Sequence, residues 1–364
     1  MADQLRLGVV GANPNVGWAS RTHMPALLAL PEYEIAAVCT TKRESAEAAA
    51  QKYEADRAYS DYRLLVADPN VDVVDVCVRV PFHHEIVMAA LQEGKHVYCE
   101  WPLGATVQQA TEMAELAEKR GVRAMVGLQA RGSPSLIHLR NLISNGWLGE
   151  VLSSNLTQFS SGLLDERGPE AVWRGDRANG ANTMSISFGH TIDAFNWVLG
   201  PFAEISGIVD TRAPEWPLKE GGSIKVDAPD YITVTGRLAG GAVATATVGN
   251  VPFMAPGMRW EIYGTEGTIV ATAQQMQAAG VRLQGARRGD EQLEDIAVPT
   301  DLRWTPAEVP DGTPVNVAQM MRRLGQSIRD GSTIQPTFAD AVRNHRLLDA
   351  VERSSSSGRV VTIE

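Results

Sequence analysis

Residues 5–18 have the composition and spacing of a phosphate-binding turn. An alternating apolar run from Leu5 to Val9 stops near Gly11, and a helical pattern begins after Gly17. Backbone N–H groups at the start of a helix favour an anion, and glycines let a pyrophosphate approach closely. The middle glycine of the usual fingerprint is Asn13 here, and one extra residue lengthens the turn. We expect a dinucleotide pyrophosphate to lie against Gly11, Asn13, Asn15, Val16, Gly17 and Trp18.

The residues at the end of the second predicted strand would contact the adenosine ribose. This strand covers residues 33–41, and the side chains at its end are Thr40, Thr41, Lys42 and Arg43. An acid at this place would bind the 2′-hydroxyl of NAD, whereas cations and hydroxyl groups suit the 2′-phosphate of NADP. The sequence favours NADP(H), with NAD(H) left open. In the alternative interpretation, Lys42 and Arg43 only cover a solvent-exposed corner.

Composition limits the classes of function. The chain has 364 residues, 44% of them hydrophobic and 21% charged, which predicts a globular protein of two domains. A formal net charge of −10 argues against direct binding of nucleic acid, which needs a basic surface. There is no apolar run of about 18 residues, so we predict no membrane span, and the N-terminus has no signal-peptide pattern.

The cysteines and histidines show no metal-binding pattern. Cys39, Cys77 and Cys99 lie in apolar, strand-like runs, which is typical of structural thiols in a reducing compartment. We therefore expect a cytoplasmic protein. The histidines have no common spacing with cysteines or acids, so no metal site is predicted.

Strands and helices alternate along residues 1–147. Short apolar strands are predicted at 5–10, 33–41, 71–80, 96–99 and 124–128, with helical segments between them. This alternation predicts a doubly wound parallel sheet of the Rossmann type, in which the carboxyl ends of the strands face the ligand. The residues that we place along this rim are Arg79, Val80, Pro81, His84, Glu100, Trp101, Pro102 and Gln129. For His84, packing at a helix start is an equal alternative.

Residues 148–335 have a different pattern. Strand-like runs at 151–160, 203–209, 231–238, 242–250, 259–263 and 268–273 surround a helix at 185–199. We predict an α/β plus α+β protein, with a Rossmann domain followed by an open, predominantly antiparallel sheet. Helices would cover one sheet face, and the other would be free for a second subunit, giving a dimer or tetramer. Residues 213–227 and 286–314 are predicted as surface connections, and residues 336–364 as a helix and strand that pack on the first domain.

Several motifs resemble those of the glucose–fructose oxidoreductase/inositol dehydrogenase (Gfo/Idh/MocA) family. Residues 94–103 read GKHVYCEWPL, residues 188–193 read FGHTID and residues 264–267 read GTEG. Within this family, residues 17–26 and 128–134 look like the branch of a yeast galactose-regulon repressor. The resemblance implies nicotinamide dinucleotide binding for the whole family, and a cis peptide at Trp101–Pro102.

The resemblance also implies where catalysis would occur. Family dehydrogenases use a lysine, an aspartate and a histidine on a sugar hydroxyl, but here the lysine position is Trp101 and the aspartate position is Ile186. Only His190 is retained, with Asp193 three residues later on the same helical face. Tryptophan cannot exchange a proton near neutral pH, so His190 is the acid–base candidate. Substrate contacts are expected from Trp101, Arg131, Trp173, Arg174, Asn182 and His190.

Two main functions follow from these observations, and a sugar-binding protein in which the cofactor has no role is a third alternative. The first is an NAD(P)-dependent oxidoreductase that acts on a sugar, polyol or sugar derivative. The second is a catalytically silent sensor that binds a dinucleotide and another protein, like the yeast repressor. The retained histidine favours the first function, and the missing lysine and aspartate favour the second.

Overall fold

The computed structural model describes residues 4–278 and 280–363 of the chain. These residues form two compact units, each with its own sheet. The first unit takes the chain up to Gly132 together with Arg303–Arg343, and the second takes Ser133–Leu302 and the chain from Asn344 onward. The chain therefore crosses between the units more than once, which a division into consecutive segments does not anticipate.

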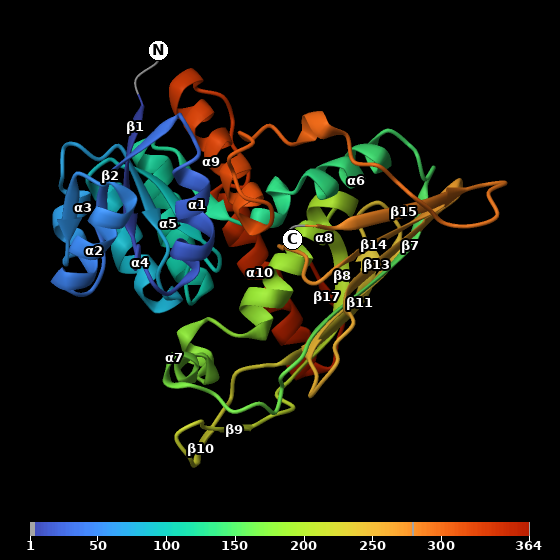
Figure 1. The fold of residues 1–364 in the computed structure, drawn as a ribbon. Helices are drawn as coiled ribbons and strands as arrows, with labels where there is room; N and C mark the ends of the chain where they lie inside the picture. Colours follow the sequence, from blue (N-terminus) through green and yellow to red (C-terminus); the bar gives the residue numbers. More distant parts are fainter. Residues whose placement is uncertain (1–3, 279, 364) are drawn as a thin grey trace. The chain divides into compact units, whose positions relative to one another are not determined.

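The first unit contains a six-stranded, entirely parallel sheet with the strand order β3-β2-β1-β4-β5-β6 (Figure 1). This order and direction confirm the predicted Rossmann fold. The strands are β1 (Leu5–Val10), β2 (Tyr33–Cys39), β3 (Arg57–Tyr59), β4 (Val73–Val76), β5 (His96–Glu100) and β6 (Ala124–Gly127). Strands β4 and β6 are wholly buried, as expected for a parallel sheet with helices on both faces.

Helices cover both faces of this sheet. One face packs against α1 (Met24–Leu27), α2 (Arg43–Tyr53) and α9 (Thr313–Asp330), with an apolar core that includes Leu27, Tyr53 and Leu324. On the other side, α3 (Tyr62–Val66), α4 (His83–Gln92) and α5 (Val107–Arg120) pack in succession. The Tyr33 hydroxyl donates a hydrogen bond to the Met321 carbonyl at 2.7 Å, which ties β2 to α9. Three short helical segments complete the unit: η1 (Ala19–His23), η2 (Val80–Phe82) and η3 (Gln129–Gly132).

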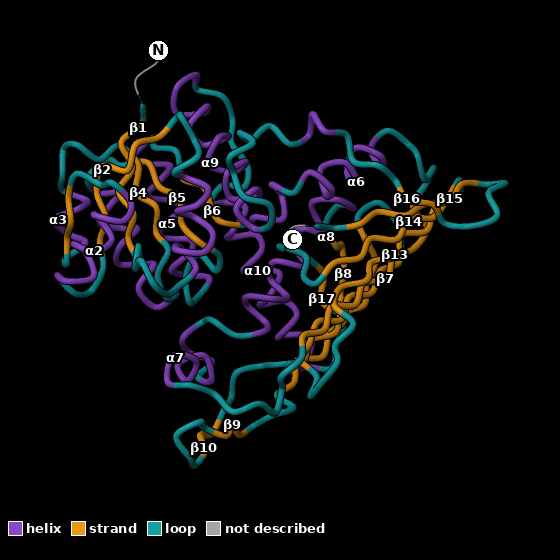
Figure 2. Tube along the Cα trace, in the orientation of Figure 1, coloured by secondary structure: helices purple, strands orange, loops and turns teal. Residues whose placement is uncertain are grey.

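The second unit contains a nine-stranded sheet with the order β16-β15-β14-β13-β7-β12-β11-β8-β17. Figure 2 shows the strands of this sheet in orange. Only the β7–β12 pair is parallel among the described pairs of this sheet, which confirms the prediction of a predominantly antiparallel sheet. The strands are β7 (Val151–Ser160), β8 (Phe202–Asp210), β11 (Tyr231–Leu238), β12 (Val243–Asn250), β13 (Gly257–Gly264), β14 (Gly267–Ala273), β15 (Arg282–Arg287), β16 (Glu294–Asp295) and β17 (Val361–Thr362).

Helix α8 (Gly189–Leu199) packs on this sheet through aromatic rings. Phe195 stacks on Phe202 and Trp260 with ring centroids 5.6 and 5.2 Å apart. The buried Trp260 indole donates a 2.8 Å hydrogen bond to the Ser154 hydroxyl, so its polar atom is satisfied. Helix α6 (Pro134–Ser144) lies beside α8, and the Asn344 amide of α10 (Phe338–Ser357) donates to the Gly189 carbonyl at 3.0 Å. These contacts hold the start of α8 in place.

The closing segment differs from what we expected. The final strand, β17, pairs with β8 of the second sheet, although we expected residues 336–364 to pack on the first domain. Ser354 and Ser355 explain this difference, because their hydroxyl groups accept hydrogen bonds at 3.0 and 2.9 Å from the backbone N–H groups of Gly207 and Val209 in β8. The end of α10 is thereby bound to the second unit.

Two segments predicted as connections contain regular structure. Residues 213–227 include a hairpin of β9 (Glu215–Pro217) and β10 (Ser223–Lys225), with Trp216 opposite Ile224. Residues 286–314 include β16 and the short helical turn η7 (Thr300–Leu302). Strand β15 also lies outside the predicted strands. No helix among the described residues is long and apolar enough to cross a membrane.

Candidate functional site

The turn after β1 has the geometry that a dinucleotide needs. Gly11 has φ of 100°, and a Cβ atom there would collide with the Cys77 carbonyl oxygen, so only glycine fits. The Asn13 side chain accepts hydrogen bonds from the backbone N–H groups of Asn15 (3.0 Å) and Val16 (3.3 Å). Asn13 therefore closes the lengthened turn by side-chain hydrogen bonds. Gly17, with φ of 106°, has open space around it, and the binding of a pyrophosphate at this turn stays a prediction.

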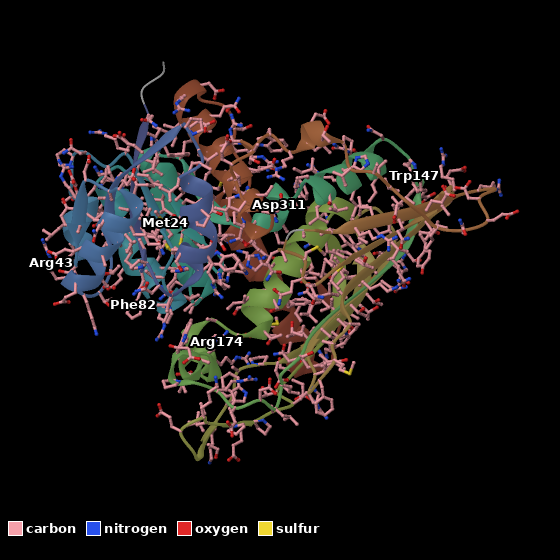
Figure 3. The ribbon with its side chains drawn as sticks, viewed as in Figure 1. Met24, Arg43, Phe82, Trp147, Arg174 and Asp311 are labelled. Atoms are coloured by element: carbon pink, nitrogen blue, oxygen red, sulfur yellow. The ribbon has the colours of Figure 1, made fainter. Side chains whose placement is uncertain are left out.

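The side chains after β2 are mostly exposed. The Thr40 hydroxyl donates to the Lys42 carbonyl at 3.0 Å and lies 2.6 Å from the Ser45 hydroxyl. Arg43 forms an exposed ion pair with Glu47 at 2.6 Å, and it lies on the outer side of the first unit (Figure 3). Thr41 and Lys42 are exposed. The preference for NADP(H) stays a prediction, and Lys42 is the cation best suited to test it.

The rim residues after β4 divide into buried and exposed positions. Val80 is buried, whereas Arg79 and Pro81 are exposed. His84 lies at the start of α4, and its Nε2 is 2.8 Å from a carboxylate oxygen of Glu112 on α5. This contact supports the alternative that His84 packs at a helix start, and a cofactor contact from it stays a prediction.

A buried hydrogen-bonded network lies at the ends of β4 and β5. His23 Nδ1 is 2.8 Å from an Asp75 carboxylate oxygen, and His23 Nε2 is 2.9 Å from Glu100 Oε1. The Gln129 amide donates to both carboxylate oxygens of Glu100, at 2.8 and 2.6 Å. The side chains of His23 and Asp75 are completely buried, and that of Glu100 is 11% exposed. Glu100 is thus fixed in position by His23 and Gln129, which come from two separate segments, and Asp75 holds His23 in turn.

In this network the pKa values of His23 and Glu100 are both shifted from their usual values. Burial lowers the pKa of His23, but Asp75, Cys77 and Glu100 together raise it well above its usual value, so the imidazole holds a proton. Burial raises the pKa of Glu100, and contact with His23 opposes this effect. A protonated His23 between two carboxylates is therefore the stable arrangement at neutral pH.

Sequence reasoning missed this network. His23 has no local partner, because Asp75 and Glu100 are 52 and 77 residues away. Asp75, a carboxylate inside the apolar run of β4, is the local signal, since a buried acid normally has a partner.

The neighbours of Glu100 and Gln129 complete the rim of the first unit. Trp101 is 4% exposed, and the Trp101–Pro102 peptide is cis, as the resemblance implied. The Pro102 carbonyl lies 2.9 Å from Nδ1 of His83. Arg131, predicted to contact substrate, is buried beside Asp340 with an N–O distance of 3.4 Å. A structural ion pair accounts for this contact, and the substrate role of Arg131 stays a prediction.

In the second unit, His190 and Asp193 lie on α8 and are both buried. Burial lowers the pKa of His190 to about 3, so the imidazole is neutral at physiological pH. Its Nδ1 is buried without a hydrogen-bond partner among the described residues. A buried nitrogen of this kind normally has a partner, so it is suited to bind a hydroxyl group of a ligand.

Asn182 fixes the helical segment that leads into α8. It forms a capping box with Ser185 at the start of η6 (Thr183–Phe188), where its side chain accepts a 3.1 Å hydrogen bond from the Ser185 backbone N–H. Ile186 lies in this segment, four residues before His190. Trp173 and Arg174 belong to the short turn η4 (Trp173–Gly175), which follows α7 (Pro169–Val172) (Figure 3).

The second unit also contains a cavity of about 260 Å³, which we call the polar cavity. It lies between the ends of β7 and β12, the start of η6 and the β9–β10 hairpin. Arg174 and Asn182, two of the predicted substrate contacts, line it together with Ile186. Its further lining residues include Ser160, Arg167, Thr183, Trp216, Asp230 and Asn250, none of which sequence reasoning identified. Among the described residues, no group of three or more His, Cys, Asp or Glu side chains could hold a metal ion.

Comparison with known proteins agrees with this geometry. The sequence model of the GFO_IDH_MocA group, described as "Oxidoreductase family, NAD-binding Rossmann fold", matches residues 5–128. A second model, described as "Gal80p, C-terminal domain", matches residues 134–273. The two matches cover most of the chain and meet near the point where the first unit ends.

Individual relatives include enzymes and a regulator. The chain is 29% identical to the dehydrogenase aclE of Aspergillus oryzae, over 99% of this chain and 98% of the relative. It is 26% identical to levoglucosan dehydrogenase of Pseudarthrobacter phenanthrenivorans (97% and 96% covered) and 28% identical to the galactose/lactose metabolism regulatory protein GAL80 of Saccharomyces cerevisiae (66% and 60%). A structure of levoglucosan dehydrogenase with NADH and levoglucosan matches with a TM-score of 0.85 and 25% identity, covering 99% and 100% of the two chains.

Proposed function

The chain belongs to the Gfo/Idh/MocA oxidoreductase family, in a branch that resembles Gal80, and from this premise we propose that it is a nicotinamide-dependent oxidoreductase of a sugar, polyol or sugar derivative. The full-length similarity to two dehydrogenases supports an enzyme. The observation that carries the proposal is the buried His190, neutral and with an unpartnered Nδ1 among the described residues.

The first unit would hold the cofactor. Gly11, Asn13 and Gly17 would form the turn around its pyrophosphate, and the polar residues after β2 would contact its ribose. Glu100 lies at the carboxyl end of β5 and is fixed by His23 and Gln129. It would lie near the nicotinamide ring of the bound cofactor. When bound, the cofactor supplies a hydride acceptor or donor. We favour NADP(H) because Lys42 is exposed and its two neighbours in the sequence, Thr41 and Arg43, are not acids.

His190 would accept the proton of the substrate hydroxyl group. Oxidation of an alcohol requires removal of the hydroxyl proton as the hydride leaves, and a neutral imidazole can accept it. Its low pKa keeps this residue in the accepting form but makes it a weak base. We therefore propose slow turnover, with Asp193 as a positioning neighbour and Trp101 as an apolar wall beside the reacting ring.

The test is an absorbance assay at the nicotinamide band. Purified protein is mixed with NAD⁺ or NADP⁺ and a panel of levoglucosan, inositols and aldoses, under single-turnover conditions. We expect reduction with at least one substrate and a loss of about 10²–10⁴-fold in rate for His190→Asn. His138→Asn is the matched control, because His138 is a half-buried histidine of α6 in the same unit. No absorbance change with any substrate, or an unchanged rate in His190→Asn, would contradict the proposal.

A second candidate function is a dinucleotide-binding sensor that holds another protein. Trp101 and Ile186 at the positions of the family's lysine and aspartate favour it, since neither can transfer a proton. This function predicts a protein partner whose affinity changes with NAD(P)H, measured by pull-down at defined dinucleotide concentrations. A measurable turnover number would exclude it.

We also propose that the chain forms a homo-oligomer through the face of the second sheet that carries Thr157, Thr233 and Thr247. These residues are half-buried or exposed, in alternation with buried ones, so this face is accessible within the unit. The three cysteines are free and buried, which supports a reducing, cytoplasmic compartment. Sedimentation velocity of the protein tests the first point, since a monomer at micromolar concentration would contradict it.

A further inference from the structure

We propose that the polar cavity binds a monosaccharide-sized polyol that carries one carboxylate, such as an aldonic or uronic acid, and that Arg167 recognises the carboxylate. The inference deepens the proposed function by naming a substrate class, and it rests on that function only where it treats this ligand as the substrate. The cavity lies entirely within the second unit, so its geometry depends on that unit alone.

The size of the cavity selects a small ligand. Its volume of about 260 Å³ is slightly below the roughly 300–1,000 Å³ of typical small-molecule pockets. A six-carbon polyol fits this space, whereas a disaccharide or a nucleotide sugar exceeds it. The cavity therefore suits a single sugar unit.

Arg167 is held in place by neutral partners. Its Nη2 donates to the carbonyl oxygens of Gly162 at 2.6 Å and Leu163 at 3.2 Å, and its guanidinium lies 5.1 Å from the centre of the Trp216 ring. None of the ion pairs between described residues involves Arg167. A fixed guanidinium without a carboxylate retains N–H groups that match a carboxylate ligand in a two-pronged geometry.

The backbone of Arg167 is fixed as well. Its N–H donates to the Pro217 carbonyl at 2.8 Å, and its own carbonyl accepts a 3.1 Å hydrogen bond from the Lys219 N–H. These bonds attach the segment before α7 to the β9–β10 hairpin, which supplies Trp216. Gly175 lies under the hairpin, where a Cβ atom would be 3.3 Å from the Trp216 ring. Arg167 and Trp216 are therefore positioned together as a cationic and an aromatic wall.

The charge of the cavity favours an anion. Arg167 and Arg174 line it, and Asp230 is the acid among its lining residues. Asp230 is buried, and its two carboxylate oxygens accept hydrogen bonds from the backbone N–H groups of Arg212 at 2.8 Å and Ala213 at 2.9 Å. Those bonds use both carboxylate oxygens of Asp230, and no ion pair between described residues joins Asp230 to Arg167, so the charge of Arg167 is suited to an anionic ligand.

The remaining lining groups suit hydroxyl groups. The Asn250 amide donates to the Thr183 hydroxyl at 3.0 Å, which uses one of its two N–H groups and leaves its carbonyl oxygen as an acceptor. Ser160 and Ser187 add two hydroxyl groups to the lining. Trp216 offers an aromatic face of the kind that packs against the C–H groups of a sugar. Together these groups match a polyol with one charged end.

The decisive test is calorimetric binding with ligand pairs in which a carboxylate replaces one hydroxymethyl group. D-Gluconate is compared with D-glucitol, and D-glucuronate with D-glucose, using the full-length protein with and without NADPH. We expect the acids to bind about 10- to 100-fold more tightly, because a hydrogen bond to a charged group has that effect on Kd. Equal affinities within both pairs would overturn the proposal. Tighter binding of D-glucose 6-phosphate than of D-glucuronate would overturn the assignment of a carboxylate.

Variants identify the residue responsible. Arg167→Gln should remove the preference for the acids, and Arg237→Gln is the matched control, since Arg237 is an exposed arginine on β11 of the same unit. Circular dichroism and a melting curve check that each variant folds. If Arg167→Gln does not fold, the Kd of the wild type is measured at increasing salt concentration. A site that recognises charge should bind gluconate more weakly as salt is added, with no change in the Kd for glucitol. An acid preference that survives in folded Arg167→Gln would contradict the role of Arg167.

The two proposals fail in different ways. Tight binding of an acid without any nicotinamide reduction would support the cavity assignment and contradict the enzyme. Turnover of a neutral sugar with the same KM in wild type and Arg167→Gln would support the enzyme and contradict the cavity assignment.

Discussion

Replacing His23 with glutamine should destabilise the first unit in a manner that depends on pH. Glutamine keeps part of the hydrogen bonding but removes the positive charge between Asp75 and Glu100, which lie 2.8 and 2.9 Å from the two ring nitrogens. Removal of one partner from a buried ion pair costs about 3–5 kcal/mol of unfolding free energy. We expect a loss of this size for His23→Gln at pH 7.

The dependence on pH follows from the direction of the pKa shift. The pKa of His23 is raised well above 6.5, so its stabilising effect is complete below pH 6.5 and is lost as the pH rises through the folded-state value. Between these values the folded protein holds one proton that the unfolded chain releases, which costs about 1.4 kcal/mol of stability for each pH unit. Above pH 7, and up to the folded-state pKa of His23, the wild type should therefore lose stability that the variant does not lose.

The raised pKa of Glu100 acts in the same direction, because its stabilising effect also decreases as the pH rises. Its stabilising effect is present below about pH 4.5 and is lost as the pH rises through the folded-state value.

The assay is urea unfolding followed by circular dichroism at pH 7, 8 and 9. Limited proteolysis within β4 and β5 assigns the transition to the first unit, because the two units can unfold separately. The control is His83→Gln, since burial lowers the pKa of His83 and its stabilising effect is lost only as the pH falls. The stability difference between wild type and His23→Gln should narrow with pH, while that for His83→Gln stays constant. Parallel curves for wild type and His23→Gln would refute the assignment of a protonated His23.

Three further predictions concern ligand binding and catalysis. Gly11→Ala should abolish measurable dinucleotide binding and lower the melting temperature, because the φ of 100° at Gly11 and the nearby Cys77 carbonyl exclude a side chain. An unchanged Kd for NADPH, measured by fluorescence titration, would contradict this prediction. Lys42→Ala should weaken NADP(H) binding by about 10-fold and leave NAD(H) binding unchanged. Arg43→Ala should have a smaller effect, because Arg43 is already paired with Glu47. Equal losses of affinity for both cofactors in Lys42→Ala would contradict this prediction. If His190 is the base, kcat/KM should show no ionisation between pH 5 and 7, because its pKa of about 3 lies below that range; an inflection near 6.5 that disappears in His190→Asn would contradict it.

Most of the fold could be predicted because it depends on local pattern. The buried strands β4 and β6 and the alternating strands β7 and β11 each follow from the period of their apolar residues. Strand β15 does not, because its sequence, Arg-Leu-Gln-Gly-Ala-Arg, has only one large apolar residue. It is a strand because β14 offers it a partner, and pairing of this kind cannot be read from composition.

The residues of the candidate site could be predicted only where they lie together in one short segment of the sequence. The turn from Gly11 to Gly17 is such a segment, and even there the role of Asn13 depends on hydrogen bonds that spacing does not reveal. The His23 network and the polar cavity combine residues from distant parts of the chain. Arg167 and Trp216, for example, come from two segments that are joined by backbone hydrogen bonds and by the contact between these two side chains. Tertiary structure creates these sites, so the sequence gives them no common pattern.

The serines at the end of α10 have a consequence for how copies of this protein can associate. Strand β8 is the last long strand of its sheet, and the N–H groups of Gly207 and Val209 would otherwise be open to an incoming strand. Ser354 and Ser355 occupy both, and β17 occupies the neighbouring stretch. Growth of the sheet by addition of a foreign strand is thereby blocked at this border. Copies of this chain can therefore meet through a sheet face without adding strands to one another at the β8 border.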